Sequence, residues 1–224
     1  MERKVLIVIP AYNEEDNIGL LLKRILKLFP LNDVLVVDDG STDNTYSIAK
    51  DSGVNLISQP SNFGKGMALK KGFEFAIKNG YQAVITMDAD LQHNPSEIPK
   101  FLVAFKEGVD LIIGTRHPSL NEMPLVRFLV NHTTSLVTSL LSGIRVRDSQ
   151  SGYRLLSTDL LSNINIETYR FQTETEIIIK AARLGYGVKE IPVETLYLKE
   201  TRSHINPIID TIRFILLSIK LLWR

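Results

Sequence analysis

The residues best suited to chemistry are two aspartates, Asp88 and Asp90, separated by one alanine. They directly follow the apolar run 83–87, which is typical of a buried strand. Two carboxylates at this spacing can reach one hard cation such as Mg²⁺ or Mn²⁺, and Gln92 offers a further carbonyl oxygen. Such an ion can hold a diphosphate and neutralise the charge of a leaving group. A solvated turn before Pro95 would use the same residues, but their position after a strand favours a metal site.

Polar residues also follow three other apolar runs, in the ranges 10–15, 38–43 and 114–116. In an open α/β sheet, ligands bind beyond the carboxyl ends of the strands, so these residues are expected to meet the two aspartates at one edge. Stability alone gives little reason to place so many charges there. A carboxylate in 38–43 is suited to bind a base or a ribose hydroxyl, whereas Ser41 or Thr42 could simply cap the following helix.

The glycine-rich segment 62–66, Asn-Phe-Gly-Lys-Gly, precedes a helical pattern but lacks the spacing of a phosphate-binding loop. Lys65 could meet a phosphate at the start of that helix, and an ordinary turn explains the segment equally well. The sequence therefore leaves the role of Lys65 open.

Short apolar runs alternate with helical patterns along most of the chain. Because the runs are apolar on both faces, they are typical of strands covered by helices on both sides. We predict strands over 5–9, 33–37, 55–58, 83–87, 110–114 and 190–193. We predict helices over 17–29, 42–52, 65–79, 95–107, 125–141 and 173–184, and an extended or looped segment over 146–156. The alternation predicts one α/β domain around a largely parallel sheet.

The composition is that of an ordinary globular protein of 224 residues, with 44% hydrophobic and 23% charged residues. Lysine and arginine number 26 against 25 acidic residues, so the net charge is only +1, and we expect no nucleic acid as a partner. The absence of cysteine excludes disulfides, thiolate metal sites and cysteine nucleophiles.

The last apolar stretch, 208–223, contains Arg213 and Lys220 and ends in Trp223. No stretch of the chain reaches the length that spans a bilayer. On a helix, the charged residues of this segment share one side and apolar residues cover most of the remainder. Such a helix could lie at a membrane surface, anchored by tryptophan and arginine, or it could pack on the core.

Six motifs occur in order and together resemble glycosyltransferase family 2, in particular its dolichyl-phosphate mannose synthase-like and polyprenyl-phosphate glycosyltransferase branch. Each motif alone is a weak signal, but six in register are strong. They span most of the chain and lie at residues 8–14, 36–43, 62–66, 87–95, 114–116 and 148–154.

This resemblance implies a GT-A fold and an inverting, metal-dependent transfer from a nucleotide-activated sugar. It divides the chain into a GT-A catalytic domain, 1–204, and an amphipathic juxtamembrane helix, 205–224. It implies that Asp88, Asp90 and Gln92 hold Mg²⁺ or Mn²⁺. The residues implied to contact the nucleotide sugar are Pro10, Tyr12, Glu14, Asp39, Asp88, Ala89, Asp90 and Arg116. The implied catalytic residues are Asp90, Arg116, Asp148 and Arg202; Arg202 lies on a loop that closes over the phosphates in the family, and no role is assigned to His204.

The acceptor decides which further residues are needed. A lipid phosphate is already ionised near neutral pH, so it needs orientation more than a general base, and arginine suits that task. Arg116 and Arg127 are the candidates for binding it, with Ser135 and its neighbours Asn131 and Thr134. A sugar hydroxyl would instead need a carboxylate to take its proton, and the candidates are Asp148, Glu174 and Glu176. The interfacial tail favours the lipid acceptor.

The resulting hypothesis is a glycosyltransferase that moves a hexose, mannose from GDP-mannose, onto a polyprenyl or dolichyl phosphate. The enzyme would work peripherally on the cytoplasmic face of a membrane, with a membrane-anchoring partner, or as the catalytic part of a membrane protein. One alternative keeps the fold and uses a UDP-sugar such as UDP-glucose, with a lipid phosphate or a glycan hydroxyl as acceptor. An alternative of another class is a non-catalytic nucleotide-sugar-binding subunit at a membrane.

Overall fold

A computed structural model describes residues 4–116, 125–170, 172–194, 196 and 207–222. Its centre is a seven-stranded sheet with the strand order β3-β2-β1-β4-β6-β5-β7. All neighbouring strands are parallel except β6, which is antiparallel to both β4 and β5. The strands are β1 Val5–Ala11, β2 Val34–Asp38, β3 Asn55–Ser58, β4 Ala83–Thr86, β5 Leu111–Thr115, β6 Arg154–Ser157 and β7 Val188–Pro192. The largely parallel α/β sheet expected from the sequence is confirmed.

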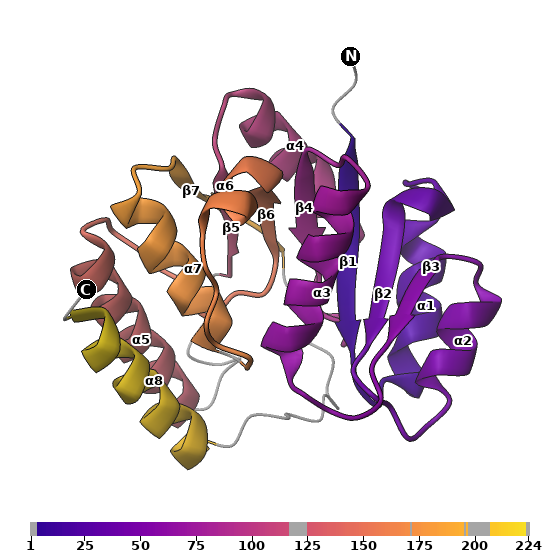
Figure 1. The fold of residues 1–224 in the computed structure, drawn as a ribbon, viewed down its shortest axis with the longest axis horizontal. Coiled ribbons are helices and arrows are strands. Elements are labelled where there is room, and N and C mark those ends of the chain that lie inside the picture. The colour runs from indigo at the N-terminus through magenta and orange to yellow at the C-terminus, as the bar shows by residue number, and fades with distance from the viewer. Residues whose placement is uncertain (1–3, 117–124, 171, 195, 197–206, 223–224) are drawn as a thin grey trace.

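Helices cover both faces of the sheet (Figure 1). The apolar side chains of β1 and β2 point alternately to the two faces, which explains why these strands are buried throughout. One apolar core contains residues of α1, α2 and α4, and the other contains residues of α3, α6 and α7. The helices are α1 Glu15–Ile25, α2 Thr45–Asp51, α3 Lys65–Lys78, α4 Ile98–Lys106, α5 Leu125–Ser142, α6 Thr158–Asn163, α7 Gln172–Arg183 and α8 Pro207–Leu222.

Strand β6, which was not predicted as a strand of the sheet, lies inside the sheet between β4 and β5. We had expected an extended or looped segment over 146–156. The strand is only four residues long and begins with Arg154, a residue type that is almost never fully buried. Here its guanidinium donates hydrogen bonds of 2.6–2.8 Å to the backbone carbonyls of Ser149, Ser151 and Glu174. These three hydrogen bonds make the burial of Arg154 possible, and no local sequence pattern predicts them.

The antiparallel direction of β6 determines which residues reach the ligand edge of the sheet. The carboxyl ends of the parallel strands lie together at one edge. Because β6 runs the other way, its first residue lies at that edge, where Arg154 pairs with Thr86 at the end of β4. The segment 148–153, which precedes β6, is thereby brought beside the residues that follow β4.

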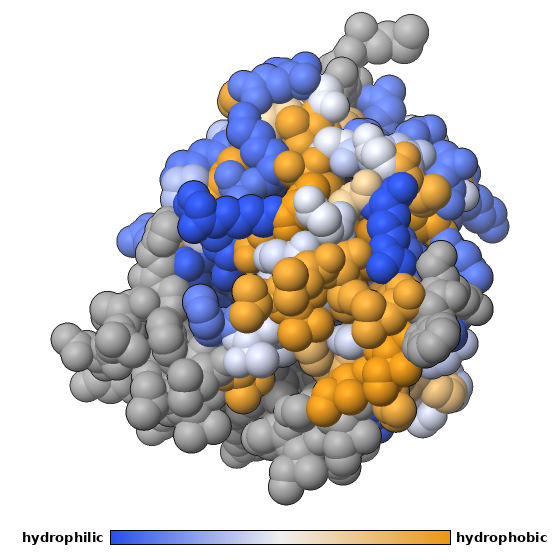
Figure 2. Space-filling view, turned by 90° about the vertical axis from the view of Figure 1, so that its left-hand side faces the viewer, coloured by the Kyte–Doolittle hydropathy of each residue, from blue (hydrophilic) through white to orange (hydrophobic). Residues whose placement is uncertain are grey.

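The last helix packs on the body of the protein by one side only. Leu217 and Leu221 of α8 are buried in a small cluster with Leu141 of α5 and Ile179 of α7. Figure 2 looks onto the side that carries α5 and α8 and shows apolar side chains gathered in a broad patch. Among the side chains of these two helices that the structure describes, the exposed large apolar ones are Val130, Leu136, Leu140, Ile215, Leu216, Ile219 and Leu222. Among the described residues, no helix combines the length and apolar character needed to cross a bilayer.

Candidate functional site

The turn that carries Asp88 and Asp90 is supported by a stack of aromatic side chains. The backbone N–H of Asp88 donates a 3.0 Å hydrogen bond to Nδ1 of His93, which is buried. The His93 ring stacks on Tyr153 at a centroid distance of 4.8 Å, and Tyr153 packs on Phe101 at 4.5 Å. The Tyr153 hydroxyl also donates to the carbonyl of Asn94, at 3.0 Å. The 148–154 motif therefore packs directly against the 88–94 turn. The sequence pattern had assigned His93 no role.

The backbone of this turn adopts a conformation that is rare for its residue types. Leu91 has a φ of 64°, in the left-handed region that a branched side chain seldom occupies. Directly after Asp90, this turn aims the N–H of Gln92 at Oδ1 of the aspartate, at 3.0 Å. Such conformations persist where the surrounding structure enforces them, and they concentrate at functional sites.

Asp88 is one of two carboxylates that share a lysine. Nζ of Lys65 lies 2.6 Å from Oδ1 of Asp88 and 2.8 Å from Oε1 of Glu174. Burial alone would raise the pKa of Asp88, but the Lys65 ammonium outweighs it and lowers this pKa to about 2. Burial likewise opposes the charge of Lys65, and the two carboxylates nevertheless raise its pKa. Asp88 and Lys65 are therefore both ionised at neutral pH. Lys65 belongs to the site, a role that the sequence had left open.

Two further carboxylates increase the negative charge at this edge. Burial, and then the nearby charge of Asp88, raise the pKa of Asp90. Burial also raises the pKa of Glu14, although Asn17 donates a 2.7 Å hydrogen bond to it and partly opposes the effect. A bound cation offsets the electrostatic repulsion between closely spaced carboxylates. The oxygen donors of Asp88 and Asp90 suit Mg²⁺ or Mn²⁺, although the described part of the chain contains no preformed group of three acidic or histidine ligands.

Arg116 and Asp148, which the sequence had assigned separately, form one ion pair. Nε and Nη2 of the arginine lie 2.7 and 2.8 Å from the two carboxylate oxygens of Asp148, and the backbone N–H of Arg116 donates to the same carboxylate. Burial would raise the pKa of Asp148, but the hydrogen bonds and charge of Arg116 lower it. Glu190 of β7 accepts hydrogen bonds from the backbone N–H groups of Arg147 and Asp148 and so fixes this segment.

The loops after β1 and β2 are joined by hydrogen bonds. Asn13, with a φ of 54°, accepts from the backbone N–H of Thr42 and donates its own N–H to Oγ of Ser41. The N–H of Glu14 donates to Oγ1 of Thr45 at 2.7 Å. Capping of the next helix by Ser41 or Thr42, which the sequence had left open, does not occur: α2 begins at Thr45, and its N-cap residue Asn44 makes no side-chain cap.

The carboxylate of Asp39 holds the backbone of the glycine-rich segment 62–66 in place. Its buried carboxylate accepts hydrogen bonds from the Gln59 side chain at 2.6 Å and from the backbone N–H groups of Phe63 and Gly64 at 2.9 and 2.8 Å. Burial raises the pKa of Asp39 despite these bonds. The adjacent Gly40 has a φ of 70°, and a Cβ there would lie 2.5 Å from the backbone of Ser61. Asp39 and Gly40 thus set where α3, and with it Lys65, begins.

The remaining candidates are distributed as follows. Pro10 and Ala89 are buried, and Tyr12 is partly exposed. Ser135 of α5 is buried, and its hydroxyl accepts a 3.0 Å hydrogen bond from the N–H of Ser149. Glu176 accepts bonds from the N–H groups of residues 167 and 168 and pairs with Lys180. The side chains of Arg127, Arg202 and His204 lie outside the described residues.

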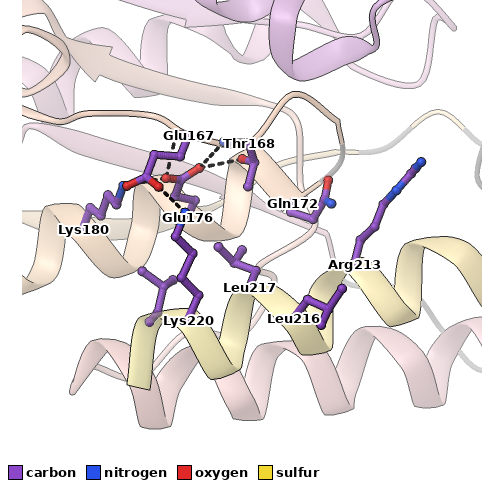
Figure 3. Close-up of a pocket in the computed structure, with 10 residues that line it drawn as sticks. Glu167, Thr168, Gln172, Glu176, Lys180, Arg213, Leu216, Leu217 and Lys220 are labelled. Carbon is purple, nitrogen blue, oxygen red and sulfur yellow. Dashed lines mark hydrogen bonds and ion pairs between the residues drawn. The ribbon is translucent and has the colours of Figure 1, made fainter. Parts of the chain in front are cut away.

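A separate cavity of ≈ 230 Å³ lies between α7 and α8 (Figure 3). On one side, Lys180 pairs with Glu176 at 2.6 Å, and Lys220 of α8 pairs with Glu167. Leu216 and Leu217 of α8 form part of its wall. The Lys220–Glu167 pair ties the last helix to the loop before α7, and we assign this cavity no role in the chemistry.

Comparison with known proteins identifies the family of this chain. Residues 6–159 match the family Glycosyl transferase family 2. The polyprenol monophosphomannose synthase of Mycolicibacterium smegmatis is 31% identical over 205 residues, which cover 85% of this chain and 77% of the relative. The UDP-N-acetylglucosamine–dolichyl-phosphate N-acetylglucosaminyltransferase of Methanococcus voltae is 31% identical over 219 residues, which cover 88% of this chain and 87% of the relative.

Among solved structures, a glucosyl-3-phosphoglycerate synthase from Mycobacterium tuberculosis, in complex with Mn²⁺ and UDP-glucose, matches with a TM-score of 0.74. The match covers 97% of this chain and 79% of that chain at 22% identity, so it establishes the fold alone. The expected GT-A architecture is confirmed by it. The protein belongs to glycosyl transferase family 2 and is a glycosyltransferase.

Proposed function

We propose that the protein transfers a hexose from a nucleoside-diphosphate sugar to a polyprenyl or dolichyl phosphate. The observation that supports this proposal is that a cluster of carboxylates and an arginine lie at the same edge of the sheet. Crowded carboxylates after β1 and β4 suit a metal-bound diphosphate, and the Arg116–Asp148 pair after β5 offers a guanidinium for a phosphate. Both named relatives are lipid-phosphate sugar transferases, which supports the acceptor class.

On the donor side, the proposed contacts are with the loops after β1, β2 and β4. A divalent ion bound by Asp88, Asp90 and Gln92 would neutralise the charge that develops on the departing nucleoside diphosphate. The residues proposed to bind the nucleotide sugar are Pro10, Tyr12, Glu14, Asp39, Asp88, Ala89, Asp90 and Arg116. We propose GDP-mannose as donor, with a UDP-sugar as the competing candidate, because the two relatives are a mannose synthase and a UDP-N-acetylglucosamine enzyme.

On the acceptor side, a lipid phosphate needs orientation and partial removal of water, and not deprotonation. Arg116 and Arg127, with Ser135, are proposed to hold it, and Arg202 to close over the phosphates. The low pKa of Asp148 keeps this carboxylate ionised, so it holds the Arg116 guanidinium in place. Arginine matches phosphate oxygens with two parallel donors, which a lysine cannot do.

The exposed apolar side chains of α5 and α8 support a peripheral position at a membrane, and we propose that this is its cytoplasmic face. A patch of this kind on a monomer often marks an interaction surface. We propose that residues 205–224 act as a juxtamembrane helix beside the catalytic domain, 1–204, with their outer side in the lipid headgroup region. The prenyl chain of the acceptor would then reach the site from the bilayer.

The test is a transfer assay with purified protein in detergent-lipid micelles. Radiolabelled GDP-mannose, UDP-glucose and UDP-N-acetylglucosamine are each offered with undecaprenyl phosphate, dolichyl phosphate or a glycan carrying only hydroxyl acceptors. We expect a labelled lipid product from one donor, in the presence of Mn²⁺ or Mg²⁺, and its loss with EDTA. Asp90→Asn should abolish it, whereas Asp16→Asn, on the exposed first turn of α1, should not. Transfer to the glycan alone would refute the lipid-phosphate acceptor.

A further inference from the structure

The partly buried ammonium of Lys65 contacts one carboxylate oxygen of the proposed metal ligand Asp88. Lys65 bridges Oδ1 of Asp88 and Oε1 of Glu174, at 2.6 and 2.8 Å. The other oxygen of Glu174 is buried and has no hydrogen-bond partner among the described residues. The ammonium of Lys65 therefore pairs with two carboxylates, and the described part of the chain supplies no hydrogen bond to Oε2 of Glu174.

The pair is closely confined. An added Cβ at Gly152 would come within 2.6 Å of both Nζ of Lys65 and Oδ2 of Asp88. The three partners also come from separate parts of the fold: Lys65 begins α3, Asp88 follows β4, and Glu174 lies in the first turn of α7. Such a contact across three elements fixes the position of the positive charge and does not leave it free on a surface.

A divalent ion and the Lys65 ammonium compete for the same carboxylate. An ion that arrives alone meets a fixed positive charge beside its ligand, which weakens its binding. An ion that binds together with a diphosphate brings anionic oxygens, whose negative charge offsets the positive charges of the ion and of Lys65. The flexible stem of a lysine also lets its ammonium turn from a carboxylate to a phosphate oxygen. Mg²⁺ sites of enzymes commonly combine one or two carboxylates with substrate phosphates.

We propose that Lys65 makes divalent-ion binding depend on the nucleotide, so that the metal binds tightly only together with the donor diphosphate. This inference rests on the proposed metal dependence of transfer and adds a residue that controls it. Lys65 acts here as a positioning residue on Asp88, with Glu174 holding the lysine in the absence of the donor. As a consequence, the metal ion and the nucleotide bind to the site together.

The experiment measures Mn²⁺ binding by electron paramagnetic resonance, which reports free Mn²⁺ and requires no turnover. The full chain is titrated alone and with saturating GDP or UDP. For the wild type, we expect the nucleotide to increase Mn²⁺ affinity by on the order of tenfold or more. For Lys65→Gln, which removes the charge and keeps a hydrogen-bond donor, we expect Mn²⁺ to bind about tenfold more tightly without nucleotide. The gain caused by the nucleotide should shrink accordingly.

Two variants serve as controls. Lys71→Gln, on the same helix, removes a surface charge whose partner Glu74 is also exposed, and it should leave both affinities unchanged. Lys65→Arg keeps the charge and should retain the dependence on nucleotide. If Lys65 has only a structural role, Lys65→Gln will instead weaken Mn²⁺ binding, because Asp88 loses its orientation. Thermal denaturation of each variant with and without Mn²⁺ checks that it is folded.

The outcomes separate this inference from the function on which it rests. Equal Mn²⁺ affinity of the wild type with and without nucleotide would overturn it without any variant. Tight binding that Lys65→Gln leaves unchanged would overturn it as well, while the proposed metal dependence stands. If neither protein binds Mn²⁺ even with GDP or UDP, the metal dependence itself fails, and the role of Lys65 fails with it.

Discussion

The apolar face of α5 and α8 should govern how strongly the protein binds to lipid. Leu140 is 75% exposed and Leu136 is 55% exposed, one helical turn apart on α5. Moving a fully exposed leucine side chain out of water gains roughly 1.5–3 kcal/mol, so their exposed fractions correspond to about 1–2 kcal/mol each. Replacing both leucines with serine should therefore weaken membrane partitioning by about 2–4 kcal/mol, which is roughly 30-fold or more.

The assay is sedimentation with vesicles of neutral and anionic phospholipid, at low and high salt. The control is Val103→Ser on α4, because Val103 is 59% exposed on a helix that lies outside the proposed face. Since the lost contribution is apolar, the difference between the leucine variant and the wild type should persist at high salt. Circular dichroism should show both variants folded, because the replaced side chains lie mainly in solvent.

The reasoning would be refuted by a leucine variant that binds vesicles as tightly as the wild type. It would also be refuted by a comparable loss in the Val103 variant, since lipid would then not distinguish this face from others. A loss of transfer to lipid phosphate in vesicles, with transfer in detergent unchanged, would connect the surface to function. That result would place the defect in access to the acceptor and not in the active site.

Other predictions concern the framework of the site. Arg154→Met removes the donor to three buried carbonyls and should destabilise the protein by about 3–5 kcal/mol in urea unfolding. For Asp148, whose folded pKa is lowered by Arg116, the stabilising effect is complete above its unfolded pKa, near 3.8, and is lost as pH falls through the folded value. Asp148→Asn should accordingly cost stability at pH 7, and the difference should vanish in strong acid; a constant difference would contradict the assignment. Gly40→Ala should weaken nucleotide binding in calorimetry, because a φ of 70° strains a residue that carries a Cβ and the added Cβ would lie 2.5 Å from the backbone of Ser61, so the loop must shift. Unchanged affinity would show that this loop does not contact the nucleotide.

Much of the site could be predicted because its residues follow strands. The Asp88–Asp90 pair comes directly after β4, and Arg116 comes directly after β5, so local patterns placed both at one edge of the sheet. That inference needs only the direction of parallel strands. Boundaries were less accurate: the helix expected over 17–29 is α1, Glu15–Ile25, and the helix expected over 42–52 begins only at Thr45.

The parts that could not be predicted depend on contacts between residues far apart in the chain. Lys65 lies more than 100 positions before Glu174, and neither residue carries a local signal of the other. His93 gave no indication that it would stack on Tyr153. The burial of Arg154 depends on carbonyls whose positions are known only after the chain has folded. Periodicity and motif spacing describe short segments and contain no information about such pairs.

The antiparallel strand β6 explains why the two halves of the site depend on each other. It places Gly152 against the Lys65–Asp88 pair, and Tyr153 beneath the turn that holds Asp90. The family match ends at residue 159, yet Glu174 of α7 and Glu190 of β7 lie beyond it and hold Lys65 and the Asp148 segment. If the proposed site binds the donor, a substitution in α7 or β7 should change that binding without contacting the donor. Relatives that differ after residue 159 can accordingly share the motifs and still differ in how metal and nucleotide bind.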